Sequence, residues 1–287
     1  MDALSRDGRF GLTIIAFVGS VFSPYYAWAG RANPKDHVAI NVALYGPRGR
    51  WAMTERGEGA LQQSEDCFQV GPSRLSWDGE GLTIEIDERS SLLSRPVRGV
   101  VRVRPWALNA ARLVLDGRGR HRWGPIAPGA DVEAEFRDPN LSWRGAGYFD
   151  ANDGDESLEE GFREWHWSRA HLGRDTAVLY EVQRRDGTAE SHALLFGRDG
   201  KLEQRPSPPK APLPGTGWRI RRLTRADDPT GVRLVKTFED TPFYARSALE
   251  TRLFGQGALA VHESLDLDRF SAPWVRRLLP FRMPRAG

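Results

Sequence analysis

Hydrophobic and polar residues alternate along much of the chain with the two-residue period of β-strands. In residues 82–88, Leu82, Ile84 and Ile86 alternate with polar residues, which is typical of a strand with one buried face. Residues 98–106 repeat this alternation, whereas helical periodicity is nearly absent from the chain. The pattern therefore predicts a mostly β protein.

The second half of the chain has the pattern of a series of β-hairpins. Residues 176–196 hold two strands around Asp186 and Gly187, a pair favoured in two-residue hairpin turns. The segment 206–217 is too rich in proline to join a strand ladder, so we expect a loop there. Short strands separated by turns are typical of a sandwich or a barrel. Further strands are predicted at close spacing, over residues 231–240, 245–254 and 258–267.

An apolar stretch near the N-terminus, residues 11–22, has three interpretations. About a dozen residues are too few to span a membrane as a helix, which needs roughly 20. A signal peptide has a similar length, but residues 1–9 carry charges of both signs. β-Branched and aromatic residues dominate the stretch, and Gly19 and Pro24 punctuate it. We therefore expect a buried strand.

Composition narrows the classes of function. A chain of 287 residues is expected to form one large or two medium domains, and 40% hydrophobic residues are enough for a packed core. The net charge is only +3 and the arginines are spread along the chain, which argues against a nucleic-acid binder. The single cysteine, Cys67, excludes an internal disulfide and a cysteine-based metal cluster, and it fits a reducing compartment.

Acidic residues crowd the segment 147–157, GYFDANDGDES. A calcium loop of the EF-hand type needs an oxygen ligand at position 5, glycine at position 6 and glutamate at position 12. Counted from Asp150, these positions hold Gly154, Asp155 and Gly161, so the motif is missed. Asp150 stands apart from the other acids because it directly follows two aromatic residues. We expect the other acids to lie in a solvated turn, namely Asp153, Asp155 and Glu156.

Motifs for a serine nucleophile, a phosphate-binding loop and a zinc protease are missing. His166 and His171 are five residues apart, which does not place them on one helical face. The sequence motifs therefore predict neither a metal nor a nucleotide cofactor. Ten tryptophans is a high count, and they either fill β cores or line a cavity for a large apolar ligand. Trp165 and Trp167 fall on one strand face, where core packing is the favoured interpretation.

Several long segments, in order along the chain, resemble the carotenoid 1,2-hydratases of purple phototrophic bacteria, also called hydroxyneurosporene synthases. The segments that carry the resemblance are residues 9–28, 51–57, 147–153 and 162–170. The resemblance implies two tandem lipocalin-like antiparallel β-barrel domains. We expect them over residues 1–145 and 146–287, with the boundary at about 140–160.

The resemblance also implies a hydro-lyase. The expected reaction adds water across the terminal C1–C2 double bond of an acyclic carotenoid, such as neurosporene or lycopene, and gives a tertiary alcohol. The family needs neither an organic cofactor nor a metal, so the expected partners are the carotenoid and water. The expected location is the cytoplasm, with peripheral contact with the inner or intracytoplasmic membrane.

The catalytic groups of the family lie in a His-x-Trp pair and a Tyr-x-Asp pair. The matching residues in this chain are His121 and Trp123, and Tyr148 and Asp150. Within a strand, the two members of each pair point to the same side. The resemblance assigns these roles. Taken singly, His121 and Asp150 would be turn residues, and Trp123 and Tyr148 would be packing residues.

The reaction explains why an acid stands beside aromatic rings. Asp150 would protonate C2, and the faces of Trp123 and Tyr148 would stabilise the cation at C1. His121 would position the attacking water and accept its proton. We expect a dry aromatic cavity to raise the pKa of Asp150, and we expect His121 to be neutral, because a charged imidazole would lower that pKa.

Two other functions are open. A lipocalin-like carotenoid or lipid carrier would have the same barrels without the chemistry. A structural partner would contact other carotenoid-pathway enzymes in an assembly. The tail, residues 272–287, mixes apolar residues with arginines, so it either lies on an anionic membrane or forms a disordered or domain-packing terminus.

Overall fold

The computed structural model describes residues 1–286, and over these residues it is mostly β, as predicted. It has 21 strands, and its longest α-helix has 10 residues. The chain divides into two compact units, and each unit is assembled from separate segments. None of the helices within the described chain has the length and hydrophobicity that crossing a bilayer requires.

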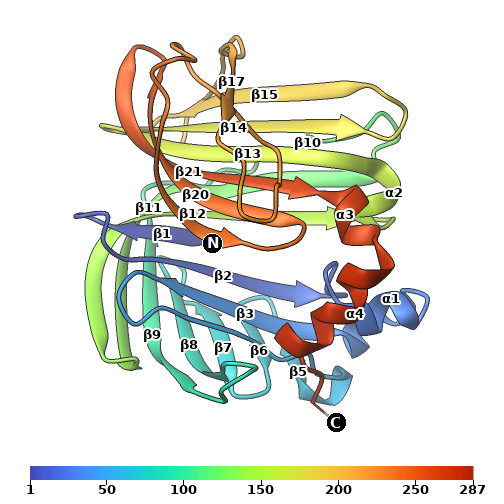
Figure 1. Ribbon diagram of the computed structural model, residues 1–287. Helices are drawn as coiled ribbons and strands as arrows, with labels where there is room; N and C mark the ends of the chain where they lie inside the picture. The colour runs from blue at the N-terminus through green and yellow to red at the C-terminus, as the bar shows by residue number, and fades with distance from the viewer. Residues whose placement is uncertain (287) are drawn as a thin grey trace. The chain divides into compact units, whose positions relative to one another are not determined.

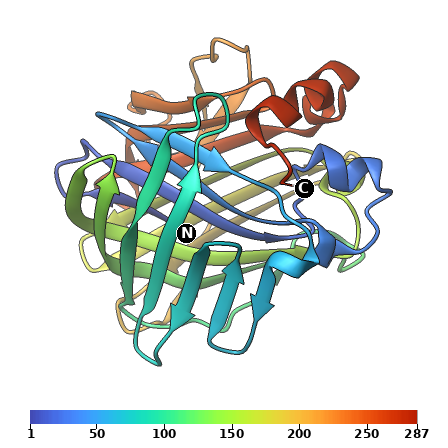
Figure 2. The same ribbon diagram turned by 90° about the horizontal axis from the view of Figure 1, so that it is seen from below.

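The first unit contains residues 1–105, 130–149 and the C-terminal segment from residue 276. Its antiparallel sheet has the order β4-β3-β2-β1-β12-β11-β9-β8-β7-β6-β5, and Figure 2 shows how strongly this sheet curves from the blue strands to the teal ones. The elements that belong to this unit alone are β1 (Asp2–Ser5), β2 (Gly11–Val18), α1 (Pro24–Trp28), η1 (Pro34–Asp36), β3 (Val38–Tyr45), β4 (Arg50–Met53), η2 (Glu58–Ala60), β5 (Leu61–Gln63), β6 (Cys67–Val70), β7 (Ser73–Trp77), β8 (Leu82–Arg89) and β9 (Pro96–Pro105).

The predicted strands of the first unit are confirmed, and one of them is shorter than expected. Every second residue of β8 is buried, and the strand pairs with β9 over its whole length. β2 begins at Gly11 as expected but ends at Val18. Gly19 then adopts φ +66°, and a Cβ there would lie 2.8 Å from Pro34. Only glycine fits this turn, so the apolar residues beyond it leave the sheet and lead to α1.

The second unit contains residues 106–129 and 150–275. Its seven-stranded antiparallel sheet has the order β16-β15-β14-β13-β21-β20-β19, and a two-stranded ribbon pairs β17 with β18 (Figure 1). Two long strands, β11 (His121–Asp138) and β12 (Leu141–Gly154), have residues in both units. The other elements are β10 (Leu113–Val114), α2 (Leu158–Gly161), β13 (Phe162–Leu172), β14 (Asp175–Arg184), β15 (Ala189–Phe196), β16 (Leu202–Gln204), β17 (Lys210–Leu213), β18 (Arg222–Arg225), β19 (Arg233–Asp240), β20 (Tyr244–Leu253), β21 (Gln256–Asp266), α3 (Leu267–Ser271) and α4 (Pro273–Arg282).

The hairpin predicted around Asp186 and Gly187 is confirmed, since β14 and β15 pair in register on either side of it. The loop predicted over residues 206–217 is partly wrong, because Lys210–Leu213 forms β17. Pro212 lies opposite Leu223 in a ribbon of only two strands. A strand with a single neighbour tolerates a residue that lacks a backbone N–H, so proline content alone did not exclude it.

The two faces of the seven-stranded sheet differ in chemistry. On one face, Ala170, Leu179 and Leu249 belong to the apolar core of this unit. On the other face, Trp167 stands opposite Tyr180, and both side chains are buried. The core position favoured for Trp167 is thus confirmed, whereas Trp165 is only half-buried.

The tail is ordered and packed over residues 272–286. Val275 and Leu279 of α4 are buried, and Arg285 forms ion pairs with Asp36 and Glu55. The expectation of a terminus that packs on the domain is therefore confirmed, and that of a disordered terminus is wrong. The boundary between residues 145 and 146 stays a prediction about where autonomous domains begin and end.

Candidate active site

The site centres on one hydrogen bond between the start of β11 and the end of β12. Trp123 is fully buried, and its indole Nε1–H donates to Oδ2 of Asp150 across 2.9 Å. Asp150 itself is half-buried. An indole N–H seeks a partner when its ring is buried, and a carboxylate oxygen is a strong acceptor. The bond therefore fixes the orientation of the Asp150 carboxyl group beside the indole ring.

Further aromatic rings lie beside this pair. The ring of Tyr180 on β14 lies 4.8 Å from that of Trp123, and the ring of Trp165 lies 6.3 Å from that of Tyr180. Burial, and then the nearby charge of Asp150, raise the pKa of the Tyr180 phenol. Tyr180 therefore stays protonated at neutral pH. It was not among the predicted site residues, although the register of the hairpin placed it opposite Trp167.

His121 lies two residues before Trp123 on β11, so the two side chains share a strand face. Its imidazole is 3% exposed and packs against the ring of Phe162 at 4.5 Å. Burial lowers the pKa of His121, against the raising effect of the Asp116 and Glu156 carboxylates. The direction agrees with the neutral imidazole expected from the sequence.

Tyr148 lies two residues before Asp150 on β12 and is 1% exposed. It belongs to the first unit, where it stands opposite Asp2 of β1. Of the four predicted residues, Trp123 and Asp150 are therefore joined by a direct bond. His121 is their neighbour on β11, and Tyr148 shares a strand with Asp150.

The acidic turn behind Asp150 is held by arginines. Asp153 pairs with Arg112 and Arg122, and Asp155 also pairs with Arg122, with half-exposed carboxylates. Both acids are therefore solvated as predicted, but Asp153 lies in β12, and only Asp155 lies in the bend that follows the strand. No group of three or more His, Cys, Asp or Glu side chains is placed to hold a metal ion anywhere in residues 1–286.

For Glu156 the prediction of a solvated turn is wrong. Its side chain is only 7% exposed, and its carboxylate lies 3.4 Å from Nε2 of His121. Arg118 and Arg120 pair with the same carboxylate at 3.0 and 2.6 Å, which compensates for its burial. Spacing within the acidic segment gave no signal of this, because the partners come from residues more than 30 positions earlier.

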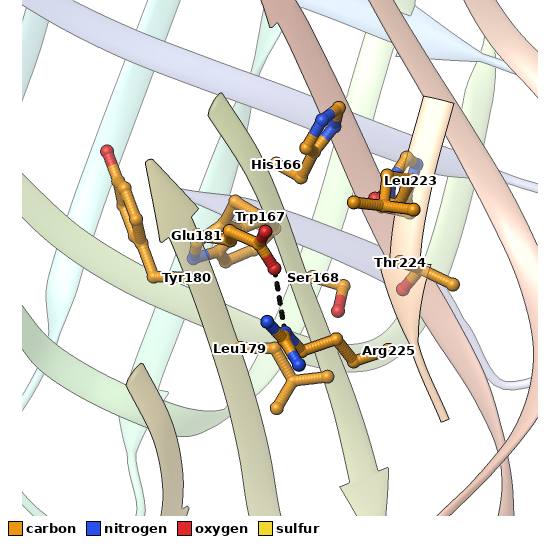
Figure 3. A pocket seen from close by; sticks show the side chains of 10 residues that line it. His166, Trp167, Ser168, Leu179, Tyr180, Glu181, Leu223, Thr224 and Arg225 are labelled. Carbon is orange, nitrogen blue, oxygen red and sulfur yellow. Dashed lines mark hydrogen bonds and ion pairs between the residues drawn. The ribbon is translucent and has the colours of Figure 1, made fainter. Parts of the chain in front are cut away.

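A small cavity beside β13 is lined by His166 and His262 and also by Trp167 and Tyr180 (Figure 3). His166 stands opposite Ser264 of β21 and bonds to its Oγ at 2.7 Å, while Nε2–H of His262 donates to the carbonyl of Leu223 at 2.9 Å. The two imidazoles are stacked 6.4 Å apart. Burial lowers the pKa of His166 to about 3 and that of His262 to about 4. Neither imidazole is charged at neutral pH, so this group is a buried polar core rather than part of the Asp150 site.

Comparisons with known proteins identify the family of the chain. The family model described as carotenoid hydratase CrtC matches residues 14–287. The chain belongs to this family. The acyclic carotenoid 1,2-hydratase of Thiocapsa roseopersicina is 53% identical over 100% of this chain and 72% of its own length. The enzyme of the same name from Cereibacter sphaeroides is 42% identical over 95% of this chain and 98% of its own length.

Solved structures support the mostly β fold of this CrtC family member. An AttH-type protein of Nitrosomonas europaea gives a TM-score of 0.61 with 12% identity, over 92% of this chain and 89% of that one. CghA, in a crystal structure with Sch210972, gives a TM-score of 0.52 with 15% identity, over 92% of this chain and 86% of that one. At such identities the likeness concerns the fold alone.

Proposed function

We propose that this protein hydrates the terminal C1–C2 double bond of acyclic carotenoids such as neurosporene and lycopene, and forms 1-hydroxy carotenoids. Family membership supports the substrate class and the reaction. The observation that carries the mechanism is the hydrogen bond from Trp123 to Asp150, which holds a carboxyl group among buried aromatic rings. Neither an organic cofactor nor a metal takes part in the proposed reaction.

The proposed first step is proton transfer from the protonated carboxyl of Asp150 to C2. The two π electrons form the new C2–H bond and leave a tertiary cation at C1. Water then attacks C1, and the proton lost from its oxygen passes to His121. The atoms of one water molecule are thus added, and the proton taken by His121 restores Asp150 through solvent.

Aromatic faces stabilise the cation without trapping it. A desolvated ring contributes roughly 2 kcal/mol to binding a cation. Trp123 bonds to Asp150, and the ring of Tyr180 lies 4.8 Å from that of Trp123, so these two rings are the first candidates, and Tyr148 is the third. A phenolate would be a nucleophile, so the raised pKa of Tyr180 favours stabilisation of the cation over its capture.

Hydration is tested by incubating the purified protein with lycopene or neurosporene in ¹⁸O-labelled water. We expect a product heavier by one water, with the label in the hydroxyl group, because water is the nucleophile. The activity should persist with a chelator and without added nucleotide. Mass spectrometry is the appropriate readout, because saturated carbons separate the reacting bond from the polyene and the colour barely changes. An absolute need for a metal or redox cofactor would contradict the mechanism.

We also propose that the chain folds as two lipocalin-like barrels, the first built mainly from residues before about 145 and the second mainly from residues after it. The strongly curved antiparallel sheet of the first unit supports this assignment, as does the meander of the second unit, in which most neighbouring strands are consecutive hairpins. The interior of a lipocalin-like barrel suits a long apolar ligand.

Peripheral contact with an anionic membrane is proposed for α4, because the substrate is stored in membranes. Trp274, Leu278 and Phe281 follow helical spacing and are 45%, 46% and 67% exposed. Val275 and Leu279 are buried, so the apolar residues of α4 occupy both its packed face and its solvent face. An exposed apolar stripe flanked by arginines fits anionic headgroups. The arginines of the helix are Arg276, Arg277 and Arg282.

Vesicle flotation tests this contact. The parent should float with vesicles rich in phosphatidylglycerol, and a triple change of Trp274, Leu278 and Phe281 to serine should lower the bound fraction about tenfold, because the buried apolar area is lost. The control changes Leu92 and Leu93 to serine, because these leucines are 80% and 67% exposed in the loop between β8 and β9. Equal flotation of the triple variant and the parent would remove α4 from the proposal.

A further inference from the structure

A buried carboxylate lies beside the buried imidazole of the site. Oε1 of Glu156 is 3.4 Å from Nε2 of His121, and the two side chains are 7% and 3% exposed. This separation is just beyond ordinary hydrogen-bond length and suits an ion pair that tightens when the imidazole gains a proton. Burial strengthens such an interaction, because little water screens it.

Two glycines, Gly154 and Gly161, pack against the imidazole of His121. A Cβ on Gly161 would lie 2.6 Å from Nε2 of His121, and a Cβ on Gly154 would lie 2.9 Å from Nδ1. Phe162 packs against the ring. Gly154 is the last residue of β12, so the Nδ1 edge faces the strand end that follows Asp150 and Asn152. The imidazole therefore has Nε2 toward the Glu156 carboxylate and Nδ1 beside the backbone of Gly154.

Two arginines hold the Glu156 carboxylate in place. Arg118 and Arg120 both pair with its carboxylate. Asp116 accepts the backbone N–H of His121 at 2.9 Å and adds a second negative charge near the ring. The charges that act on the imidazole are thus the carboxylates of Asp116 and Glu156, which favour its protonated form, and the guanidinium of Arg118, which opposes it.

We propose that Glu156 is the positioning residue for His121 in the hydration reaction. It holds the neutral imidazole with its Nε2–H toward the carboxylate, so that the lone pair of Nδ1 accepts the proton from the attacking water. When the C1–O bond forms, one O–H bond of that water breaks, and its proton passes to Nδ1. The resulting imidazolium is stabilised by Glu156. The inference rests on the proposed function, and it extends the acid and base pair by a third group.

Replacing Glu156 with glutamine keeps the shape and removes the charge. We expect kcat to fall at least about tenfold with little change in KM, because the imidazolium loses its partner only after substrate has bound. The acidic limb of the kcat profile should move to lower pH, since losing the carboxylate disfavours protonation of His121. Glu156→Asp keeps the charge and should restore part of kcat. The matched control is Asp153→Asn, a half-exposed acid paired with Arg112 and Arg122, which should leave kcat unchanged.

A second measurement is independent of turnover. The ¹H–¹³C NMR signal of the His121 ring, identified by its loss in His121→Gln, should titrate at lower pH in Glu156→Gln than in the parent and in Asp153→Asn. An unchanged titration midpoint overturns the role of Glu156, as does an unchanged kcat profile. If the parent itself forms no hydroxylated product, the proposed function fails, and the titration still decides the coupling. If Glu156→Gln does not fold, Glu156→Asp replaces it: a His121 midpoint and kcat both identical to those of the parent overturn the proposal.

Discussion

Replacing Asp150 with asparagine is expected to lower the rate of hydration at least about a hundredfold, the lower end for general acid catalysis. The amide has the shape of the carboxyl group and its oxygen still accepts the indole N–H of Trp123, so the rings stay in place. What is lost is the proton. An ordinary aspartate is protonated only about once in a thousand molecules at pH 7, so placing the proton on such a group adds roughly 4 kcal/mol to the barrier.

Three measurements make this test specific. Binding of the pigment to Asp150→Asn should survive, and Asp150→Glu should keep some activity, because the acid remains although its reach is wrong. The matched control is Asp153→Asn, three residues along β12, where the carboxylate is half-exposed and paired with Arg112 and Arg122. A folded Asp150→Asn protein that hydrates at the parent rate would favour a carrier or a different acid. If His121→Ala is inactive instead, the acid and base roles exchange.

Acid is expected to destabilise the second unit strongly because of the buried imidazoles. His262 has a folded-state pKa of about 4 against an ordinary value near 6.5. Between about pH 4 and pH 6.5, His262 therefore binds a proton in the unfolded chain but not in the folded chain. The free energy of unfolding contributed by this group is unaffected above about pH 6.5, and it falls by about 3 kcal/mol as the pH drops to about 4. His166, with a pKa of about 3, adds a loss in the same direction.

Urea unfolding at a series of pH values between about 7.5 and 4.5 tests this expectation. His166→Gln keeps a polar group opposite Ser264 but removes the titration, so its stability should fall less steeply with acid than that of the parent. The difference in free energy of unfolding between the two proteins at about pH 7.5 serves as the reference. Subtracting it removes the effect of altered packing. Parallel curves for the two proteins over the whole range would show that His166 does not couple to folding.

The sequence predicted those parts of the fold that depend on neighbouring residues. The alternation in residues 82–88 and the turn at Asp186 and Gly187 were sufficient, because strand faces and tight turns are decided within a few positions. β17 was missed because the cost of Pro212 depends on how many strands lie beside it. That number is a property of the whole sheet and not of the segment.

The site was predicted less completely, for a related reason. Trp123 and Asp150 were named because each belongs to a short motif, and the structure adds the bond between them. Glu156 was placed in a solvated turn because its neighbours in sequence are acidic. Its burial depends on Arg118 and Arg120, which reach it from the turn before β11. Tyr180 was missed because its closeness to Trp123 follows from how β14 and β11 pack.

At the start of β11, the side chains on the two faces of the strand differ in chemistry. His121 and Trp123 lie on one side, while Arg122, between them, reaches outward to Asp153 and Asp155. The outward ion pairs are open to screening by salt, whereas the buried side is not. Selection can therefore act on the two sides separately. Lineages that settle in waters of different salinity are free to exchange these surface charges without disturbing the residues that handle the pigment.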